Sequence, residues 1–314
     1  MGSDAARDEM IWGYLMHLGY NMWCDREMPD SDKPYLTARP FLRFDENLWN
    51  DLIERWADAG VNMVVIDLGE GVQYESHPEI SVKDSWATEH LQEELAKLRG
   101  KGLEPIPKLN FSTAHDAWLG EYSRCVSTER YYTVCREVIA EVIALFERPR
   151  FFHLGMDEET AEHQRNHAMA VMRQHELWWH DLNLLVEAVE EGGSRAWIWS
   201  DYVWRHPETF YKNMPHTVLQ SNWYYGDVFN EEVDYVKAYL GLEKHGYDQV
   251  PTGSNWSHDD NFEKTVAYCG EHIASELLKG FLQAPWHPTV EDYRDHHLAA
   301  TEQVKRARAA WENR

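Results

Sequence analysis

The sequence has few cysteines and no long apolar run. The cysteines are Cys24, Cys125, Cys135 and Cys269, and no two are spaced as C-x-x-C. A zinc knuckle or a thioredoxin-like redox site is therefore not expected, although a pairing of Cys125 with Cys135 stays open. No apolar stretch approaches the roughly 18 residues that a membrane span requires. The sequence predicts no membrane-spanning segment.

Basic residues are also scarce. The chain has 30 Lys and Arg against 54 Asp and Glu, which gives a formal net charge of −24. A surface this acidic repels phosphate backbones and anionic lipids. Nucleic acid is therefore not an expected partner, and no metal or organic cofactor is indicated by a motif.

The first residues have no basic segment followed by an apolar stretch, so they do not form a complete export signal. Gly2 and Ser3 resemble a cloning scar. We interpret residues 1–9 as a leader or cloning remnant, and residues 10–314 as a single catalytic domain. A native export signal that preceded this start is compatible with that interpretation.

The rest of the chain alternates short apolar runs with longer helical patterns, in the order of βα units. Strands are predicted within Tyr14–Trp23 and at Asn62–Asp67, Glu104–Asn110, Phe151–Gly155, Ala196–Ser200, Thr217–Asn222, Gln249–Ser254 and Gly280–Ala284. Helices are predicted at Glu46–Ala59, Ser85–Leu98, Glu129–Phe146, Ala161–Glu191, Glu231–Leu242, Asn261–Ile273 and Val290–Trp311.

Eight strands in this alternation predict an α/β fold, a closed (β/α)8 or TIM barrel in one domain. An open doubly wound sheet is the main alternative. That fold would carry a glycine-rich phosphate loop after the first strand, and this sequence has none there.

Tryptophan is abundant, with 15 residues, and several follow predicted strands. In a TIM barrel the active site forms at the carboxyl ends of the strands. Flat aromatic rings together with carboxylates and amides suit a sugar pocket, while core packing is the alternative for each single tryptophan. The candidate substrate-binding residues at these ends are Arg26, Asp67, Asn110, His115, Trp199, Asp201, Trp223, Tyr224, Trp256 and Trp286.

Two adjacent carboxylates, Asp157 and Glu158, follow the fourth predicted strand. Glycoside cleavage needs one protonated and one ionised carboxyl group, and two like charges in proximity help to separate their pKa values. An ordinary acidic turn or a helix N-cap is the alternative explanation, and the following Glu159 is consistent with it.

The stretch from Arg124 to Glu159 resembles the core of glycoside hydrolase family 20, the β-N-acetylhexosaminidases. In that family a helix with a Glu-Val-x-x-Leu-Phe-like end leads into a strand of the form His-x-Gly-Gly-Asp-Glu. The corresponding segments here are Glu141–Phe146 and His153–Glu158. Ile106–His115 is similar to a further family segment. Weaker similarities are Trp199, Asn222–Tyr224 and Gln283–Trp286.

The resemblance implies a retaining, substrate-assisted hydrolysis of a terminal N-acetylhexosamine. Glu158 would act first as general acid and then as base, and Asp157 would orient the acetamido group. His115 and His153 would support the site, and Trp199, Trp223 and Trp286 would wall the sugar. The expected partner is a carbohydrate, and export to the periplasm or outside the cell follows from that substrate class, with the cytoplasm as the alternative.

Three positions depart from the family pattern. Met156 replaces the second glycine of the motif, and His287 stands where the family often has an acidic residue. The tyrosine that holds the acetamido carbonyl has no clear counterpart, with Tyr224 and Tyr225 as candidates. These departures leave the catalytic pair intact and leave open a substrate without an acetamido group.

Two other functions remain open. His163 and His167, spaced i, i+4, would lie on one face of the helix predicted over Ala161–Glu191, which would suit a metal-dependent hydrolase or isomerase. A non-catalytic carbohydrate-binding barrel would keep the aromatic residues and lack turnover. No H-x-H pair follows the first strand, where a metal amidohydrolase would have one.

Overall fold

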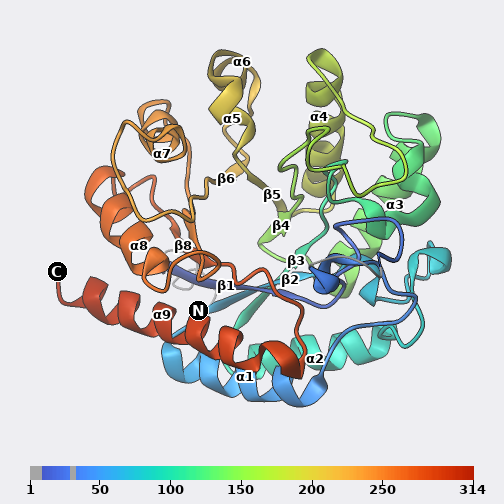
Figure 1. Ribbon diagram of the computed structural model, residues 1–314, viewed down its shortest axis with the longest axis horizontal. Coiled ribbons are helices and arrows are strands. Elements are labelled where there is room, and N and C mark those ends of the chain that lie inside the picture. The colour runs from blue at the N-terminus through green and yellow to red at the C-terminus, as the bar shows by residue number, and fades with distance from the viewer. Residues whose placement is uncertain (1–8, 29–32) are drawn as a thin grey trace.

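The computed structural model describes residues 9–28 and 33–314, and it confirms the predicted TIM barrel. Parallel strands form one eight-stranded sheet in the order β6-β5-β4-β3-β2-β1-β8-β7. The sheet closes between its two ends, where the Val250 amide donates to the Gln220 carbonyl at 2.8 Å and the Thr252 amide donates to the Asn222 carbonyl at 2.9 Å. Helices surround the strands (Figure 1).

The strands are β1 (Ile11–His17), β2 (Met63–Asp67), β3 (Glu104–Lys108), β4 (Phe151–His153), β5 (Arg195–Trp199), β6 (Leu219–Ser221), β7 (Thr252–Gly253) and β8 (Gly280–Gln283). The helices are α1 (Glu46–Ala59), α2 (Thr88–Gly100), α3 (Glu129–Leu145), α4 (Glu176–Glu191), α5 (Tyr202–Arg205), α6 (Pro207–Asn213), α7 (Asp234–Lys244), α8 (Asn261–His272) and α9 (Arg294–Glu312). The short helices α5 and α6 were not predicted.

Alternate residues of each strand face two different cores. Leu15 and Val65 point into the barrel and pack with Trp197. Their neighbours Tyr14 and Val64 point outward and pack under the helices. Strands buried on both faces read as near-continuous apolar runs, which is why their positions were predictable.

Helix α1 shows how the sequence specifies an outer element. Asp45 caps its start by accepting from the amides of Asn47 and Leu48. Gly60 ends it in a left-handed conformation with φ of 80°. Between these ends the apolar residues Leu48, Leu52, Ile53 and Trp56 recur at helical spacing and are buried.

The first strand begins earlier than predicted and ends at His17. The chain then turns across the end of β2, since the Leu18 amide donates to the Asp67 carbonyl at 2.9 Å. The Glu70 carboxylate accepts the amides of Tyr20 and Asn21 at 2.8 and 3.0 Å. The apolar residues after His17 are therefore buried in a loop, which periodicity cannot distinguish from a strand.

The predicted helix over Ala161–Glu191 is wrong in its first half, because α4 begins only at Glu176. Residues 160–175 form a loop, held by side chains from within and outside it. Glu159 accepts the backbone amide of Arg173 at 2.7 Å, and Gln164 accepts that of Val171 at 2.7 Å. These tertiary contacts override the local helical pattern.

Three further expectations concern the chain as a whole. In the described part, no helix is long and apolar enough to cross a membrane. All four cysteines are free thiols, so Cys125 and Cys135 are not bridged. The predicted leader remnant, residues 1–9, lies outside the described residues except for Glu9.

Candidate active site

A sharp turn after β4 presents the adjacent acidic residues at the carboxyl end of the barrel. Gly155, Met156 and Glu158 have positive φ values of 71°, 77° and 56°. A Cβ added to Gly155 would lie 2.0 Å from Oδ1 of Asn110, so this position requires glycine. Met156 adopts a left-handed conformation that costs a non-glycine residue roughly 1–2 kcal/mol. This backbone separates the directions of the acidic side chains.

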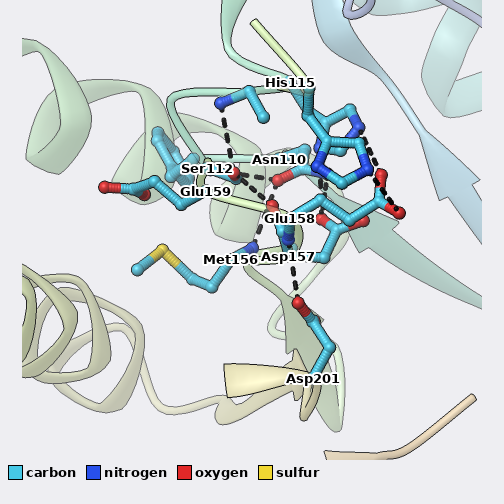
Figure 2. Close-up of polar contacts among 12 residues, drawn as sticks. Asn110, Ser112, His115, Met156, Asp157, Glu158, Glu159 and Asp201 are labelled. Carbon is cyan, nitrogen blue, oxygen red and sulfur yellow. Dashed lines mark hydrogen bonds and ion pairs between the residues drawn. The ribbon is translucent and has the colours of Figure 1, made fainter. Parts of the chain in front are cut away.

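Asp157 is buried, and its carboxylate is held by two neighbours. Nδ2 of Asn110 donates to Oδ1 of Asp157 at 2.8 Å, and Nδ1 of His115 lies 3.5 Å from the same oxygen (Figure 2). Burial alone would raise the pKa of Asp157, but the charge and hydrogen bond of His115, together with Asn110, hold it below its ordinary value. Asp157 is therefore ionised at neutral pH.

His115 lies between the two carboxylates. Its Nδ1 faces Asp157, and its Nε2 lies 3.5 Å from Oε2 of Glu158. Burial would lower the pKa of His115, but Asp157 and then Glu158 raise it to about 9. A positive imidazolium thus joins the acidic pair at neutral pH.

Glu158 is the more accessible member of the pair, with 23% of its side chain exposed. It lines a cavity of about 910 Å³. Nε2 of His163 lies 3.2 Å from Oε1 of Glu158. This carboxyl group can therefore reach a bound molecule and exchange a proton with it, which the buried Asp157 cannot do as readily.

Asp201, at the end of β5, fixes the position of Glu158. Its Oδ2 accepts the backbone amide of Glu158 at 2.9 Å (Figure 2). Burial, followed by the charge of Asp157, raises the pKa of Asp201 well above its ordinary value. Burial therefore disfavours a negative charge on Asp201, whose carboxyl oxygen accepts the Glu158 amide.

Glu159 has a structural role. Its carboxylate lies 2.6 Å from Nη2 of Arg173, and both side chains are buried. Figure 2 shows Glu159 extending to the opposite side of the turn from Glu158. Of the consecutive acidic residues 157–159, only the first two face His115.

Aromatic side chains continue the site around His115 and across the barrel mouth. Trp23 meets His115 edge-on with ring centroids 4.8 Å apart. Trp286 lies 6.1 Å from Trp23 and 5.6 Å from Trp199, and its Nε1 donates to the Tyr225 hydroxyl at 2.7 Å. Aromatic residues at the end of β5 and in the segments that follow β1, β6 and β8 therefore converge beside the carboxylates, as a sugar pocket requires.

Several predicted site residues lie in this arrangement, though not all of them can contact a substrate. Asn110 is buried and holds Asp157, and Trp199 is 1% exposed at the bottom of the aromatic group. Trp223 stacks on Tyr225 with centroids 5.0 Å apart, and both line the cavity with Tyr224.

Three predicted residues lie apart from the carboxylate pair. Asp67 is buried in an ion pair with Lys108, and Nδ1 of His17 lies 3.3 Å from its Oδ2. The side chain of Arg26 is exposed and donates to the Asn166 carbonyl at 3.3 Å. Trp256 is 38% exposed, and its ring lies against His287 at 5.3 Å.

Sequence reasoning missed two residues that hold the pair. The Ser112 hydroxyl donates to the Asp157 carbonyl. His163 was considered only as a metal ligand on a helix, whereas it lies in the loop and contacts Glu158. Its position five residues after Glu158 was the available signal. His167 lies in the same loop, which is not helical there, so the predicted helical pair is not formed.

One group could offer three ligands to a metal ion. Atoms of His115, Asp157 and Glu158 lie within 4.8 Å of one another, alone among the clusters of the described residues. A ligating histidine must be neutral. Because the pKa of His115 is raised to about 9, this histidine carries a proton at neutral pH and forms ion pairs instead.

No family model matches the sequence, and no curated protein matches it. Solved structures do. A β-N-acetylhexosaminidase from Bacteroides fragilis is 14% identical with a TM-score of 0.64, covering 93% of this chain and 65% of the other. A β-hexosaminidase from Streptomyces plicatus, in complex with the product GlcNAc, is 12% identical with a TM-score of 0.65, covering 95% and 64%.

An exo-β-N-acetylglucosaminidase of family GH20 from Vibrio harveyi is 15% identical, with a TM-score of 0.62. The alignment covers 94% of this chain and 54% of that enzyme. This chain thus spans less than two thirds of the length of these proteins. At such low identity the likeness shows the fold alone: this barrel is similar in fold to the glycoside hydrolase family 20 barrels, which agrees with the resemblance noted in the sequence.

Proposed function

We propose that this protein is a retaining glycoside hydrolase that removes a terminal N-acetylhexosamine. The observation that carries the proposal is the contrast within one dipeptide. Asp157 is buried, ionised and held by Asn110 and His115, whereas Glu158 faces a cavity. Glycoside cleavage requires such a division between a fixed negative charge and an accessible proton donor.

In the proposed mechanism Glu158 gives its proton to the glycosidic oxygen as the bond to the anomeric carbon breaks. The carbonyl oxygen of the substrate's own acetamido group attacks that carbon and forms a cyclic oxazolinium. Asp157 accepts the acetamido N–H and stabilises the positive charge. Glu158, now a carboxylate, removes a proton from water, which opens the ring with net retention.

The surrounding residues support these roles. The half-buried Trp23 offers a flat apolar face for a sugar ring, and the buried Trp199 and Trp286 pack behind it. Tyr225 is half-buried beside Trp286, and its hydroxyl is a candidate donor to the acetamido carbonyl. The structurally similar enzymes from Bacteroides fragilis and Streptomyces plicatus are hexosaminidases, which agrees with this substrate class.

The test is turnover of a panel of aryl β-glycosides: N-acetylglucosaminide, N-acetylgalactosaminide, glucoside and galactoside. We expect cleavage of the N-acetyl substrates alone. Glu158→Gln should lower kcat by about 10²–10⁴-fold, because it removes the general acid and base. Glu93→Gln is the matched control, since this glutamate of α2 is 79% exposed and does not line the cavity.

Cleavage of the glucoside or galactoside would retain the glycosidase and contradict the substrate-assisted mechanism. Absence of turnover with every substrate, together with binding of N-acetylhexosamine, would identify a carbohydrate-binding barrel instead.

A further inference from the structure

The cavity beside Glu158 extends well beyond the catalytic pair. Its volume of about 910 Å³ lies near the upper end of the range for small-molecule pockets, and it exceeds what one terminal sugar needs. Its walls come from the loop 160–175, α5 and the segments that follow β6 and β7. Because it opens on the proton donor, it lies where the leaving part of a glycoside would extend.

Two aromatic groups form walls of this cavity. Trp204 packs edge-on against Trp223 and Tyr235, with ring centroids 4.5 and 4.1 Å apart. In the second group, the Tyr202 ring stacks on the Trp178 ring, with centroids 4.0 Å apart, and its centroid lies 4.5 Å from that of the His206 ring. Trp178 is buried beneath Tyr202, while the other rings are partly exposed, and partly exposed aromatic faces suit sugar rings.

The acidic residues that line the cavity are compensated. Glu159 is paired with Arg173 at 2.6 Å. Burial, followed by the charge of Asp157, raises the pKa of Asp201, which disfavours the charged form of this group. Glu162 is 82% exposed and lies 3.9 Å from Arg165, so solvent screens most of its charge.

A positive charge in the cavity is not compensated in the same way. Arg205, the last residue of α5, lines the cavity and is exposed. Across residues 9–28 and 33–314, no carboxylate forms an ion pair with Arg205. Four histidines share the lining and can add positive charge: His163, His175, His206 and His258. This concentration stands out in a chain with a net charge of −24.

We infer that this cavity binds the leaving part of the substrate and favours a sugar that carries a carboxylate or sulfate group, with Arg205 as its partner. The inference rests on the proposed function. A guanidinium group matches planar, anionic oxygens with two parallel hydrogen bonds, and it keeps its charge at any physiological pH. The aromatic walls would hold the ring while Arg205 selects its charge.

The test compares kcat/KM for three disaccharides that share one terminal, β-linked N-acetylhexosamine. The second ring is a neutral hexose, a uronic acid or a sulfated hexose. We expect the wild type to prefer an acidic substrate over the neutral one, and Arg205→Gln to lower that preference about fivefold, as for a partly exposed ion pair. Whichever acidic substrate is preferred identifies the anionic group.

Arg165→Gln is the matched control, because Arg165 is an exposed arginine of the loop 160–175 that does not line the cavity. It should leave the preference unchanged. Equal cleavage of acidic and neutral disaccharides by the wild type, or an unaltered preference in Arg205→Gln, would overturn the inference while leaving the proposed function intact.

Failure of the proposed function gives a different result, namely no turnover even of the aryl N-acetylhexosaminide. In that case calorimetric binding of the uronic acid disaccharide decides the inference. Binding that is about fivefold weaker in Arg205→Gln would support it, and equal or undetectable binding to both proteins would overturn it.

Discussion

Nε2 of His163 lies 3.2 Å from Oε1 of Glu158, and Nδ1 of the same imidazole lies 2.8 Å from the Thr160 hydroxyl. The loop after β4 therefore supplies both the proposed acid and a histidine that touches it. The hydrogen bond to Glu158 raises the pKa of His163, although partial burial opposes the shift. His163 is 41% exposed and so connects Glu158 to solvent.

This contact predicts the alkaline limit of activity. Nε2 of His163 can pass a proton to Oε1 of Glu158, and the first step needs that proton on Glu158. The raised pKa of His163 extends the pH range over which the imidazole holds a proton for this transfer. His163→Gln removes this proton source, so the alkaline limb of kcat/KM should move to lower pH.

The measurement is the pH profile of aryl N-acetylhexosaminide hydrolysis. His115, Asp157 and Asp201 also surround Glu158 and remain in the variant. A uniform loss of activity with an unmoved limb would mean that His163 only supports the loop.

The charged His115 should make stability depend on pH. A histidine whose pKa is raised to about 9 stabilises the folded state fully below its unfolded pKa of roughly 6.5. This contribution is lost as the pH rises toward 9. Between pH 6 and 9.5 the wild type should lose up to about 3 kcal/mol more unfolding free energy than His115→Gln. Urea unfolding at the two pH values measures this difference, and equal losses would contradict the shift.

Neutralising Glu159 should lower the free energy of unfolding much more than neutralising its neighbour Glu162. Glu159→Gln leaves the buried Arg173 partly unpaired, which should cost about 3–5 kcal/mol of unfolding free energy. Glu162→Gln should change it by less than about 0.5 kcal/mol, because Glu162 is exposed. Urea denaturation compares the two, and similar values would show that the buried ion pair is not formed.

The turn that presents Asp157 should not tolerate a side chain at Gly155. Gly155→Ala would place a methyl group 2.0 Å from Oδ1 of Asn110, so Asn110 must move away from Asp157. We expect a loss of well over about 1 kcal/mol and a large fall in kcat.

Gly193→Ala is the matched control for that turn. Gly193 also has a left-handed φ, of 87°, with no atom within 4 Å of the added Cβ. It should cost only about 1 kcal/mol and leave kcat unchanged. Equal effects of the two substitutions on stability and kcat would contradict the role of the turn.

The barrel could be predicted because its strands are buried on both faces. Runs such as Met63–Asp67 are apolar throughout, and capped helices such as Glu46–Ala59 follow them. The loop 160–175 could not be predicted, because its conformation depends on Arg173 donating to the distant Phe111 carbonyl and on Gln164 accepting the Val171 amide. Helical periodicity there is a coincidence of composition.

The candidate site was predictable in its residue types and less so in their roles. The strand ends indicated Asp157, Glu158 and His115, and the structure brings these three side chains together. Burial is not visible in the sequence, so it did not show that Asn110 and Asp201 contact Asp157 and Glu158. His163 contacts Glu158 because residues 160–175 form a loop, and the helix predicted for these residues did not indicate this contact.

The most direct test of the central claim is a series of aryl N-acyl-β-hexosaminides in which the acetyl group carries zero, one, two or three fluorine atoms. Fluorine withdraws electrons from the amide carbonyl and weakens it as a nucleophile. If the acetamido group attacks the anomeric carbon, kcat/KM should fall steeply along the series. A value that stays constant would show that the substrate does not provide the nucleophile, and would contradict the proposed mechanism.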